Sequence, residues 1–366
     1  WFSNVAIFTM LVQFGVSPLI ISFVAAMHFL PGIILSPLSG TIIDRSDIKK
    51  LMITLMSIEL LMTMAFLLID SAADVWLLMI VLFIRMGAAS MFFSTEMTLL
   101  PKLISGVALQ KANEIHSIIW SFTYAAGMAI SGLVVHAWGI QTAFIIDALF
   151  FVAALSFFIP MKLDIQTSPV KEKVIDMIKD GWRYLRSHTI AVQLILLHAS
   201  VGLTSFDALV TLLADYEYKL IIAVPLAIGI SNAVRAFALM IGPLVIGSWV
   251  NKETLAKVFI LQGTAIIIWG LSSSNFYISL IGLFLTGLFT TTIWSYTYAL
   301  LQEKVEHKYL GRTLAYNEMI FMLSNVLTTL FIGLMASYVS LDIITIILGA
   351  AFYAVAYYYT RIQKWI

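Results

Sequence analysis

The stretch Gly40–Lys50, GTIIDRSDIKK, reads Gly-x-x-x-Asp-Arg, followed three residues later by two lysines. It joins one apolar segment to the next, and such a density of charge between apolar segments is typical of a cytoplasmic loop in a membrane protein. Gly40 has no side chain, so a neighbouring helix backbone can approach it closely. Asp44 is suited to the positive N-terminal end of a helix, and Arg45 is suited to a carboxylate. The loop therefore predicts a contact point between membrane helices.

The composition supports a membrane protein. Of the 366 residues, 61% are hydrophobic and 11% are charged, whereas soluble domains carry about 25% charged residues. Apolar runs of about 20 residues recur along the whole chain, which predicts an all-α protein with many membrane spans. The chain has no cysteine, which rules out disulfides and thiolate metal sites. The net charge of +1 says nothing about nucleic acid; we expect neither a metal site nor a nucleic-acid partner. No nucleotide-binding loop is visible, and we expect neither a cofactor nor an enzyme.

Twelve apolar segments are expected to cross the membrane. The first is short for a bilayer, and because Trp1 is not an initiator methionine we expect residues to precede it. The expected spans are 1–15, 18–42, 50–70, 75–100, 110–136, 138–160, 190–214, 221–249, 254–272, 276–302, 312–337 and 340–362.

The basic residues predict the orientation. Eighteen of the 21 lie in alternate loops on one side of the expected spans, and Lys219 stands alone on the other side. Arg85 and Arg235 lie inside spans. By the positive-inside rule both termini of this multi-pass protein should be cytoplasmic.

The longest loop, 161–189, should link two halves. Val174, Ile175, Ile178, Trp182 and Leu185 fall on one face at helical spacing, and basic residues fall on the other. This pattern predicts an amphipathic helix on the inner membrane surface. Its role should be structural, with lipid sensing as an alternative.

The two halves of the sequence repeat each other. The first set of residues, Gly40, Asp44 and Arg45, returns as Gly247, Asn251 and Lys252, and the pair Asn113-Glu114 returns as Asn317-Glu318. Similar offsets predict six spans that occur twice, with a site between the halves. The expected domains are residues 1–160, the linker 161–189, and residues 190–366.

These motifs resemble the major facilitator superfamily (MFS) of transporters. Arg85 with the small residues that follow it is similar to the fourth-helix motif of that family. The segment AAGMAISG resembles the glycine-rich motif of its antiporters: Gly127 and Gly132 match, while Met128 replaces a proline and Ser131 a glycine. The run LLPKLISGVALQKANEIHSIIWS, from Leu99 to Ser121, resembles the branch of macrolide-efflux proteins and the enterobactin exporter. The resemblance implies two pseudo-symmetric six-helix bundles.

Several ionisable residues are expected inside the membrane, where a charge is costly and is presumed functional or paired. Arg85 and Arg235 could bind substrate or tune a nearby carboxylate, and the alternative is a structural salt bridge. Asp207 could carry a proton, or it could reach the outer interface instead. Glu114 and Glu318 look like inner-gate residues. Glu59 and Asp147 fit a structural pair or a water-filled crevice.

Histidine and aromatic residues give weaker indications. His28 and His198 are single histidines on apolar helices, which favours packing over metal ligation. Trp120, Trp294, Tyr296 and Tyr298 could line a cavity or belong to an interfacial belt.

The resemblance also implies an inner gate. Related MFS proteins pair a basic residue of the first loop with an acidic residue at the end of the fourth helix. Here Glu96 should pair with Arg45 or Lys49, and Asp44 should lie at the start of the eleventh helix near Gly311. Both contacts should form in the outward-facing state and break when the protein opens inward.

Taken together, these residues predict a secondary transporter that exports a small amphipathic molecule, drug-like or siderophore-like, in exchange for protons by alternating access. The alternatives are an importer or lysophospholipid flippase on the same fold, and a non-transporting membrane sensor. The expected partners are a small-molecule substrate, protons and membrane lipids, and we expect a monomer.

Overall fold

The computed structural model describes residues 1–104, 106–162, 174–306 and 308–366, and within these ranges every regular element is a helix. Eleven helical segments of the described chain are long and apolar enough to cross a membrane, and the shorter apolar helix α1 precedes them. The prediction of an all-α membrane protein is therefore confirmed. The helices are α1 (Phe2–Gln13), α2 (Pro18–Ala26), α3 (Leu30–Arg45), α4 (Ile48–Ala65), α5 (Val75–Leu103), α6 (Gly106–Trp138), α7 (Ile140–Phe158), α8 (Val174–Ser187), α9 (Thr189–Ala199), α10 (Asp207–Leu213), α11 (Val224–Ile246), α12 (Leu255–Ser272), α13 (Phe276–Lys304), α14 (Leu310–Met335) and α15 (Leu341–Ile362).

Local sequence explains where several helices begin. The Ser17 hydroxyl accepts a hydrogen bond from the Ile20 N–H, and Pro18 occupies the first turn of α2. The Asp47 carboxylate accepts the Lys50 N–H at 3.1 Å at the start of α4. These are preferred residues for helix starts, because their side chains satisfy N–H groups that have no partner within the helix.

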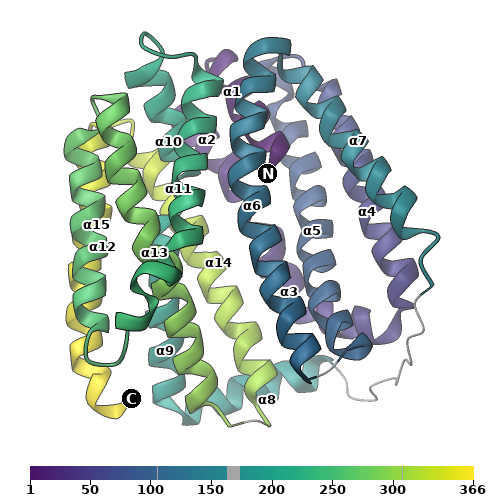
Figure 1. The fold of residues 1–366 in the computed structure, drawn as a ribbon, viewed down its shortest axis with the longest axis vertical. Coiled ribbons are helices and arrows are strands. Elements are labelled where there is room, and N and C mark those ends of the chain that lie inside the picture. The colour runs from purple at the N-terminus through teal and green to yellow at the C-terminus, as the bar shows by residue number, and fades with distance from the viewer. Residues whose placement is uncertain (105, 163–173, 307) are drawn as a thin grey trace.

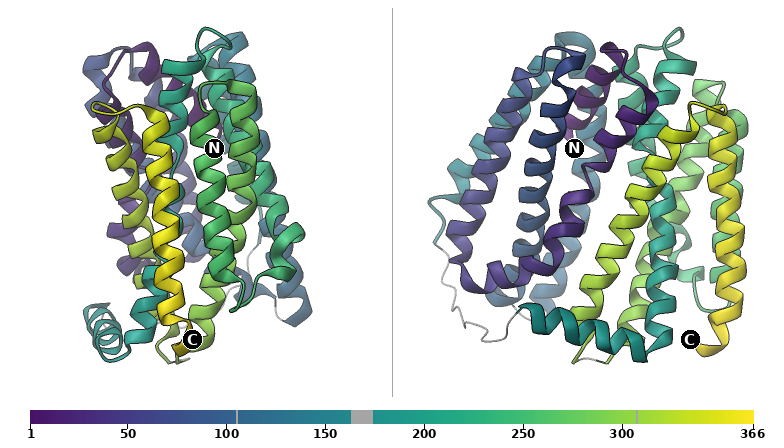
Figure 2. Two further views of the ribbon diagram at one scale, coloured as in Figure 1. Left: turned by 90° about the vertical axis from the view of Figure 1, so that its left-hand side faces the viewer. Right: turned by 180° about the vertical axis from the view of Figure 1, so that it is seen from behind.

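The helices gather in two groups (Figure 1). Helices α1 to α7 occupy one side of the molecule and α9 to α15 the other, while α8 runs across one end between them (Figure 2). This arrangement agrees with two halves joined by a linker. We retain the exact domain limits, 1–160 and 190–366, as a proposal.

The two halves touch through close backbone contacts, which we call the seam. Gly132 on α6 faces Gly229 on α11: a Cβ atom on Gly132 would lie 3.2 Å from the Gly229 Cα and 2.8 Å from the Pro225 carbonyl oxygen. Near the end of α14, a Cβ on Gly333 would lie 2.8 Å from the Pro18 carbonyl oxygen at the start of α2. Small residues let membrane helices approach this closely, so the halves are held together at this end.

Toward the opposite end of the molecule, α6 is exposed around much of its circumference. Ile118, Ile119 and Trp120 are 63%, 55% and 41% exposed. Three consecutive residues span about 200° of a helix, so α6 is exposed over a wide arc on this side of the seam.

The seventh span is broken in its middle. Between α9 and α10, residues Ser200–Thr204 form a 3₁₀ turn. Gly202 permits the break to pack on α14, where an added Cβ would lie 2.7 Å from the Ser324 side chain. A 3₁₀ stretch within a helix frees backbone carbonyls for other partners, and discontinuous helices form binding sites in transporters.

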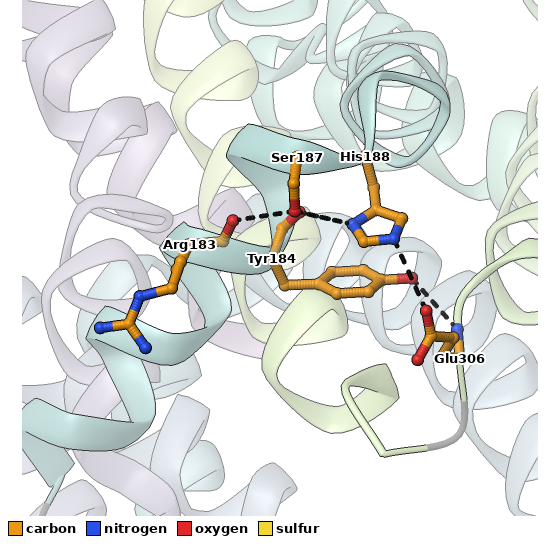
Figure 3. Close-up of polar contacts among 5 residues, drawn as sticks. All are labelled: Arg183, Tyr184, Ser187, His188 and Glu306. Atoms are coloured by element: carbon orange, nitrogen blue, oxygen red, sulfur yellow. Dashed lines mark hydrogen bonds and ion pairs between the residues drawn. The ribbon is translucent and has the colours of Figure 1, made fainter.

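The linker helix α8 is anchored to the second half (Figure 3). The Tyr184 ring stacks between His188, with centroids 3.9 Å apart, and Tyr309, at 4.4 Å. The Tyr184 hydroxyl accepts the Glu306 N–H at 3.2 Å, and His188 Nε2 lies 3.5 Å from the Glu306 carboxylate. Because His188 Nδ1 is 2.9 Å from the Tyr184 carbonyl oxygen, it must carry a hydrogen. These contacts tie the last turn of α8 to the segment that precedes α14.

The apolar face predicted for α8 is described at two of its five residues. Leu185 is buried, and Trp182 is exposed with its ring 6.4 Å from that of Tyr316, centroid to centroid. The location of this face on the membrane surface stays a prediction. The side chains of Val174, Ile175 and Ile178 lie outside the described residues.

Candidate functional site

Arg85 is buried in an ion pair within the first half. Its Nη2 donates to the Asp147 carboxylate on α7 at 2.9 Å. The Ser3 hydroxyl on α1 donates to the same carboxylate, and the guanidinium carbon lies 5.7 Å from the Phe66 and Phe151 ring centroids. The charge is thus paired and enclosed, which is the structural alternative considered above. A role of Arg85 in coupling stays a prediction.

Arg235 is the buried arginine of the second half, on α11, and its partner is a backbone carbonyl instead of a carboxylate. Its Nη2 donates to the Thr204 carbonyl oxygen at 2.7 Å, and its guanidinium lies 5.1 Å from the Phe206 ring centroid. The acceptor is a carbonyl freed by the break in the seventh span. Arg235 therefore holds the broken span against α11 with a charge-assisted hydrogen bond, and it has no carboxylate partner among the described residues.

Asp207, the first residue of α10, is half-buried and faces the first half. It lies within electrostatic range of Tyr124 on α6 and of His28. Tyr124 also interacts with Arg235, and His28 Nε2 is 3.1 Å from the Asn4 side-chain oxygen on α1. These polar groups from both halves meet beside the seam. A role of Asp207 in carrying a proton stays a prediction.

An aromatic cluster surrounds His198 in the second half. The rings of Trp294, Tyr298 and Phe321 each lie 5.5 Å from the imidazole, and Trp294 stacks on Tyr298 at 5.2 Å. The Thr297 hydroxyl donates to the Ile293 carbonyl, so it accepts from His198 Nδ1 at 2.9 Å. Nε2 of the buried ring then carries the lone pair and lacks a partner among the described residues.

Glu318 lies beside this aromatic cluster on α14. Its carboxylate is half-buried and within electrostatic range of Tyr298. Trp294 is partly exposed. The stacked Trp294–Tyr298 faces and a carboxylate without a basic partner in the described chain could together bind the cationic and aromatic parts of a small molecule. The side chain of the matching residue Glu114 lies outside the described residues.

Of the predicted inner gate, the structure describes Glu96, Arg45 and Lys49. Glu96 Oε1 lies 3.2 Å from His116 Nδ1, and Lys49 Nζ donates to the Ile159 carbonyl oxygen at 2.7 Å. No described contact joins Glu96 to Arg45 or Lys49. The pairing of Glu96 with Arg45 or Lys49 in another state of the protein stays a prediction. The surroundings of Gly40 and the side chain of Asp44 lie outside what the structure describes, so the contact of Asp44 with α14 stays a prediction.

The matching loop of the second half is described in full. Gly247 begins a 3₁₀ turn. The Asn251 side chain accepts the N–H groups of Glu253 and Thr254 at 2.9 and 3.1 Å, and Lys252 Nζ lies 3.5 Å from Glu303. The Asn251 side chain therefore closes a turn just ahead of α12, whose N-cap residue is Thr254.

The two glycines of the antiporter-like segment have different neighbours. Gly127 faces the start of the chain, where an added Cβ would lie 3.3 Å from the Trp1 Cβ. Gly132 forms the seam with Gly229. Gly229, Tyr124 and Thr204 were not expected from the sequence, because no motif marks them and their importance arises from contacts across the two halves.

Comparison with known proteins gives a consistent result. The model of the Major Facilitator Superfamily matches residues 1–261. Macrolide efflux protein A of Streptococcus pyogenes is 26% identical over 313 residues, which cover 81% of this chain and 75% of that protein. Macrolide efflux protein A of Enterococcus faecalis is 27% identical over 304 residues, covering 78% and 91%.

Solved structures share the fold. A mutant of the nucleoside transporter NupG superposes with a TM-score of 0.74 over 99% of this chain and 94% of its own, at 13% identity. The nucleoside transporter NupG itself gives a TM-score of 0.71 at the same identity, over 100% and 95%. At this identity the likeness concerns the fold alone.

Proposed function

The chain belongs to the Major Facilitator Superfamily, and from this premise we propose that it exports a small amphipathic molecule in exchange for protons. The chain is a multi-pass membrane transporter. The observation that carries the proposal is the difference between the two ends of the molecule. At one end the halves are in contact at Gly132 and Gly229, and toward the other end α6 is exposed. A transporter in this state can load substrate from the side of α8, which is the cytoplasmic side by the charge of the loops.

The substrate class follows from the aromatic cluster. Trp294 and Tyr298 offer a stacked apolar surface, and Glu318 offers a negative charge. An amphipathic organic cation would satisfy both. The names of the relatives, macrolide efflux protein A, support a bulky drug-like molecule as substrate.

For proton coupling we propose the carboxylates Glu318 and Asp207, with Glu114 as the counterpart of Glu318 in the first half. Each of these groups lies within or beside a membrane span, and a carboxylate there can alternate between charged and neutral forms. Arg235 donates to the backbone of the broken seventh span near Asp207. A change in the charge of Asp207 could therefore alter this hydrogen bond and move the backbone. Arg85 is proposed to support this half through Asp147.

The proposed gate consists of the loops at the α8 end. Asp44, Arg45 and Lys49 of the first loop would engage Glu96 and the start of α14 when the transporter faces outward. In the second half, Gly247, Asn251 and Lys252 form the equivalent loop. Gly127 and Gly132 would let α6 rock against its neighbours.

The proposed setting is the bacterial inner membrane, with both termini cytoplasmic and a single chain as the working unit. Two alternatives use the same fold: an importer or lysophospholipid flippase, and a sensor that transports nothing. The buried charges favour transport over the sensor, since a scaffold has less need to bear their cost.

Flux in liposomes tests the proposal. Purified protein would be reconstituted and supplied with a fluorescent macrolide under an imposed proton gradient, with protein-free vesicles as the control. We expect flux that stops when an ionophore collapses the gradient, and loss of that dependence in Glu318→Gln. Flux of a labelled lysophospholipid instead would favour the flippase. If the folded protein transports neither probe, the non-transporting sensor becomes the favoured alternative.

A further inference from the structure

A groove on the outer face of the second half lies between α12 and α15, far from the seam. It encloses about 350 Å³. Large apolar side chains are exposed along this face of the two helices, so the face meets lipid in a membrane; they include Ile260 and Leu261 beside the groove and Ile268, Leu271, Ile343 and Ile347 further along the pair. The residues that line the groove are Ala256, Ile260, Tyr353, Ala356, Tyr357 and Thr360.

Helix packing explains why the groove exists. At the middle of the pair the two backbones touch, since a Cβ on Gly263 would lie 2.6 Å from the Gly349 carbonyl oxygen. One turn further along, the Tyr353 hydroxyl reaches across to Thr264 at 3.0 Å and closes the groove at its membrane-embedded end. Beyond Tyr353, the small residues Ala256 and Ala356 leave room between the helices.

Positive charge gathers at the other end of the groove. Arg361 follows the lining residue Thr360, Lys257 follows Ala256, and Lys364 lies one turn beyond Thr360. The Arg361 guanidinium lies over the Tyr357 ring, 4.9 Å from its centroid, and donates from Nε to the Tyr357 hydroxyl at 3.0 Å. This contact fixes the guanidinium beside the mouth of the groove.

These cations lack negative partners in the part of the chain that the structure describes. No ion pair involves Arg361, Lys257 or Lys364 there. Of the carboxylates at this end, Glu303 is 3.5 Å from Lys252 and 4.0 Å from Lys304, and Glu253 is exposed on the preceding turn. An apolar groove that ends at unpaired guanidinium and ammonium groups is complementary to a molecule with a long apolar chain and an anionic head.

We propose that the groove between α12 and α15 binds an anionic phospholipid. One acyl chain lies along Ala256, Ala356 and Tyr353, and the phosphate meets Arg361 and Lys257. Arginine binds phosphate through two parallel N–H groups, and basic pockets between transmembrane helices bind anionic lipid heads. The site is separate from the seam and does not depend on what the protein transports.

Native mass spectrometry of the purified full-length protein tests this proposal. Phosphatidylglycerol and phosphatidylcholine with the same acyl chains would be added in parallel. We expect phosphatidylglycerol to bind preferentially, with affinity about fivefold lower in Arg361→Gln and lower again in Arg361→Gln with Lys257→Gln, since a basic residue near the surface contributes about that much for anionic lipid. Lys111→Gln removes an exposed charge from the other half and should change nothing.

A second variant separates the groove from its charges. Ala256→Phe fills the groove but keeps Arg361 and Lys257, and it should lose phosphatidylglycerol; its melting temperature shows whether it is folded. Equal binding of the two lipids, or equal effects of Arg361→Gln and Lys111→Gln, would overturn the proposal. So would full competition by inorganic phosphate, which lacks the acyl chain, or a lipid-free dimer that covers this face. If Ala256→Phe does not fold, the two charge variants still decide.

Discussion

Gly132 on α6 and Gly229 on α11 lie in direct backbone contact: a Cβ placed on Gly229 would be 3.0 Å from the Gly132 Cα. The contact joins the two halves of a transporter and leaves no room for a side chain on either residue. A seam of this kind can close fully only while both positions remain glycine.

Gly132→Val should therefore open the seam. The added side chain would collide with the Pro225 carbonyl and with Gly229, so the population should shift away from the state described here. Spin labels on cysteines at Ala73 and Ser274, both exposed near the seam end, would report the change in a chain without native cysteine. We expect a longer distance in Gly132→Val. Gly311→Ala, whose Cβ meets nothing within 4 Å, is the matched control. Equal distances in both variants would show that the seam tolerates a side chain.

The ion pair of Arg85 and Asp147 should be needed for stability. Arg85→Gln leaves a buried carboxylate without its partner, which costs about 3–5 kcal/mol in comparable cases. Asp147→Asn should destabilise similarly, and the double variant should regain much of the loss. Thermal unfolding in detergent measures all three. Should Arg85→Gln unfold like the wild type while proton-driven flux is lost, Arg85 would act in coupling rather than in folding.

The inner gate should exchange partners during transport. Glu96 contacts His116 in this state, and we expect it to meet Arg45 or Lys49 when the α8 end closes. Glu96→Arg with Arg45→Glu should then transport better than either single variant. Exposed pairs contribute about 1 kcal/mol or less, which is enough to shift a balanced equilibrium several-fold. A double variant no better than the worse single one would exclude Arg45, and Lys49 would be tested next.

The anchor of α8 should depend on the Tyr184 ring more than on its hydroxyl. Tyr184→Phe keeps the stacking on His188 and Tyr309 but loses the acceptor for the Glu306 N–H, a cost of about 0.5–1.5 kcal/mol. Tyr184→Ala removes a buried ring and should cost about 3–5 kcal/mol. Melting temperatures should therefore fall slightly in the first variant and strongly in the second. The reverse order would mean that the hydrogen bond dominates.

The orientation of the chain can be tested with single cysteines. We expect positions 49 and 252 to be protected from an impermeant thiol reagent in intact cells, and positions 73 and 274 to react, because the basic loops should be cytoplasmic. Permeabilised cells provide the control for accessibility. Labelling of position 49 from outside would reverse the assignment and, with it, the direction proposed for export.

The sequence by itself determined the spans and their repetition. A run of about 20 apolar residues must cross the bilayer as a helix, since unpaired backbone groups are too costly in lipid. The loop Gly40–Lys50 and its echo at Gly247 also indicated two related halves, because a repeated motif requires no knowledge of packing. The break at Ser200–Thr204 was not predicted: the expected span 190–214 is apolar throughout, and apolar composition does not distinguish a continuous helix from an interrupted one.

Only the tertiary structure decided which residues meet. Asp147 is the partner of Arg85, Thr204 is the partner of Arg235, and Gly229 is the partner of Gly132; each pair lies on different spans. In a soluble protein the polar face of a helix shows which side packs inward. In a membrane the lipid-facing side of a helix is as apolar as the packed side. The sequence therefore shows that a helix crosses the membrane, but the packing decides how that helix is rotated and which helices it contacts.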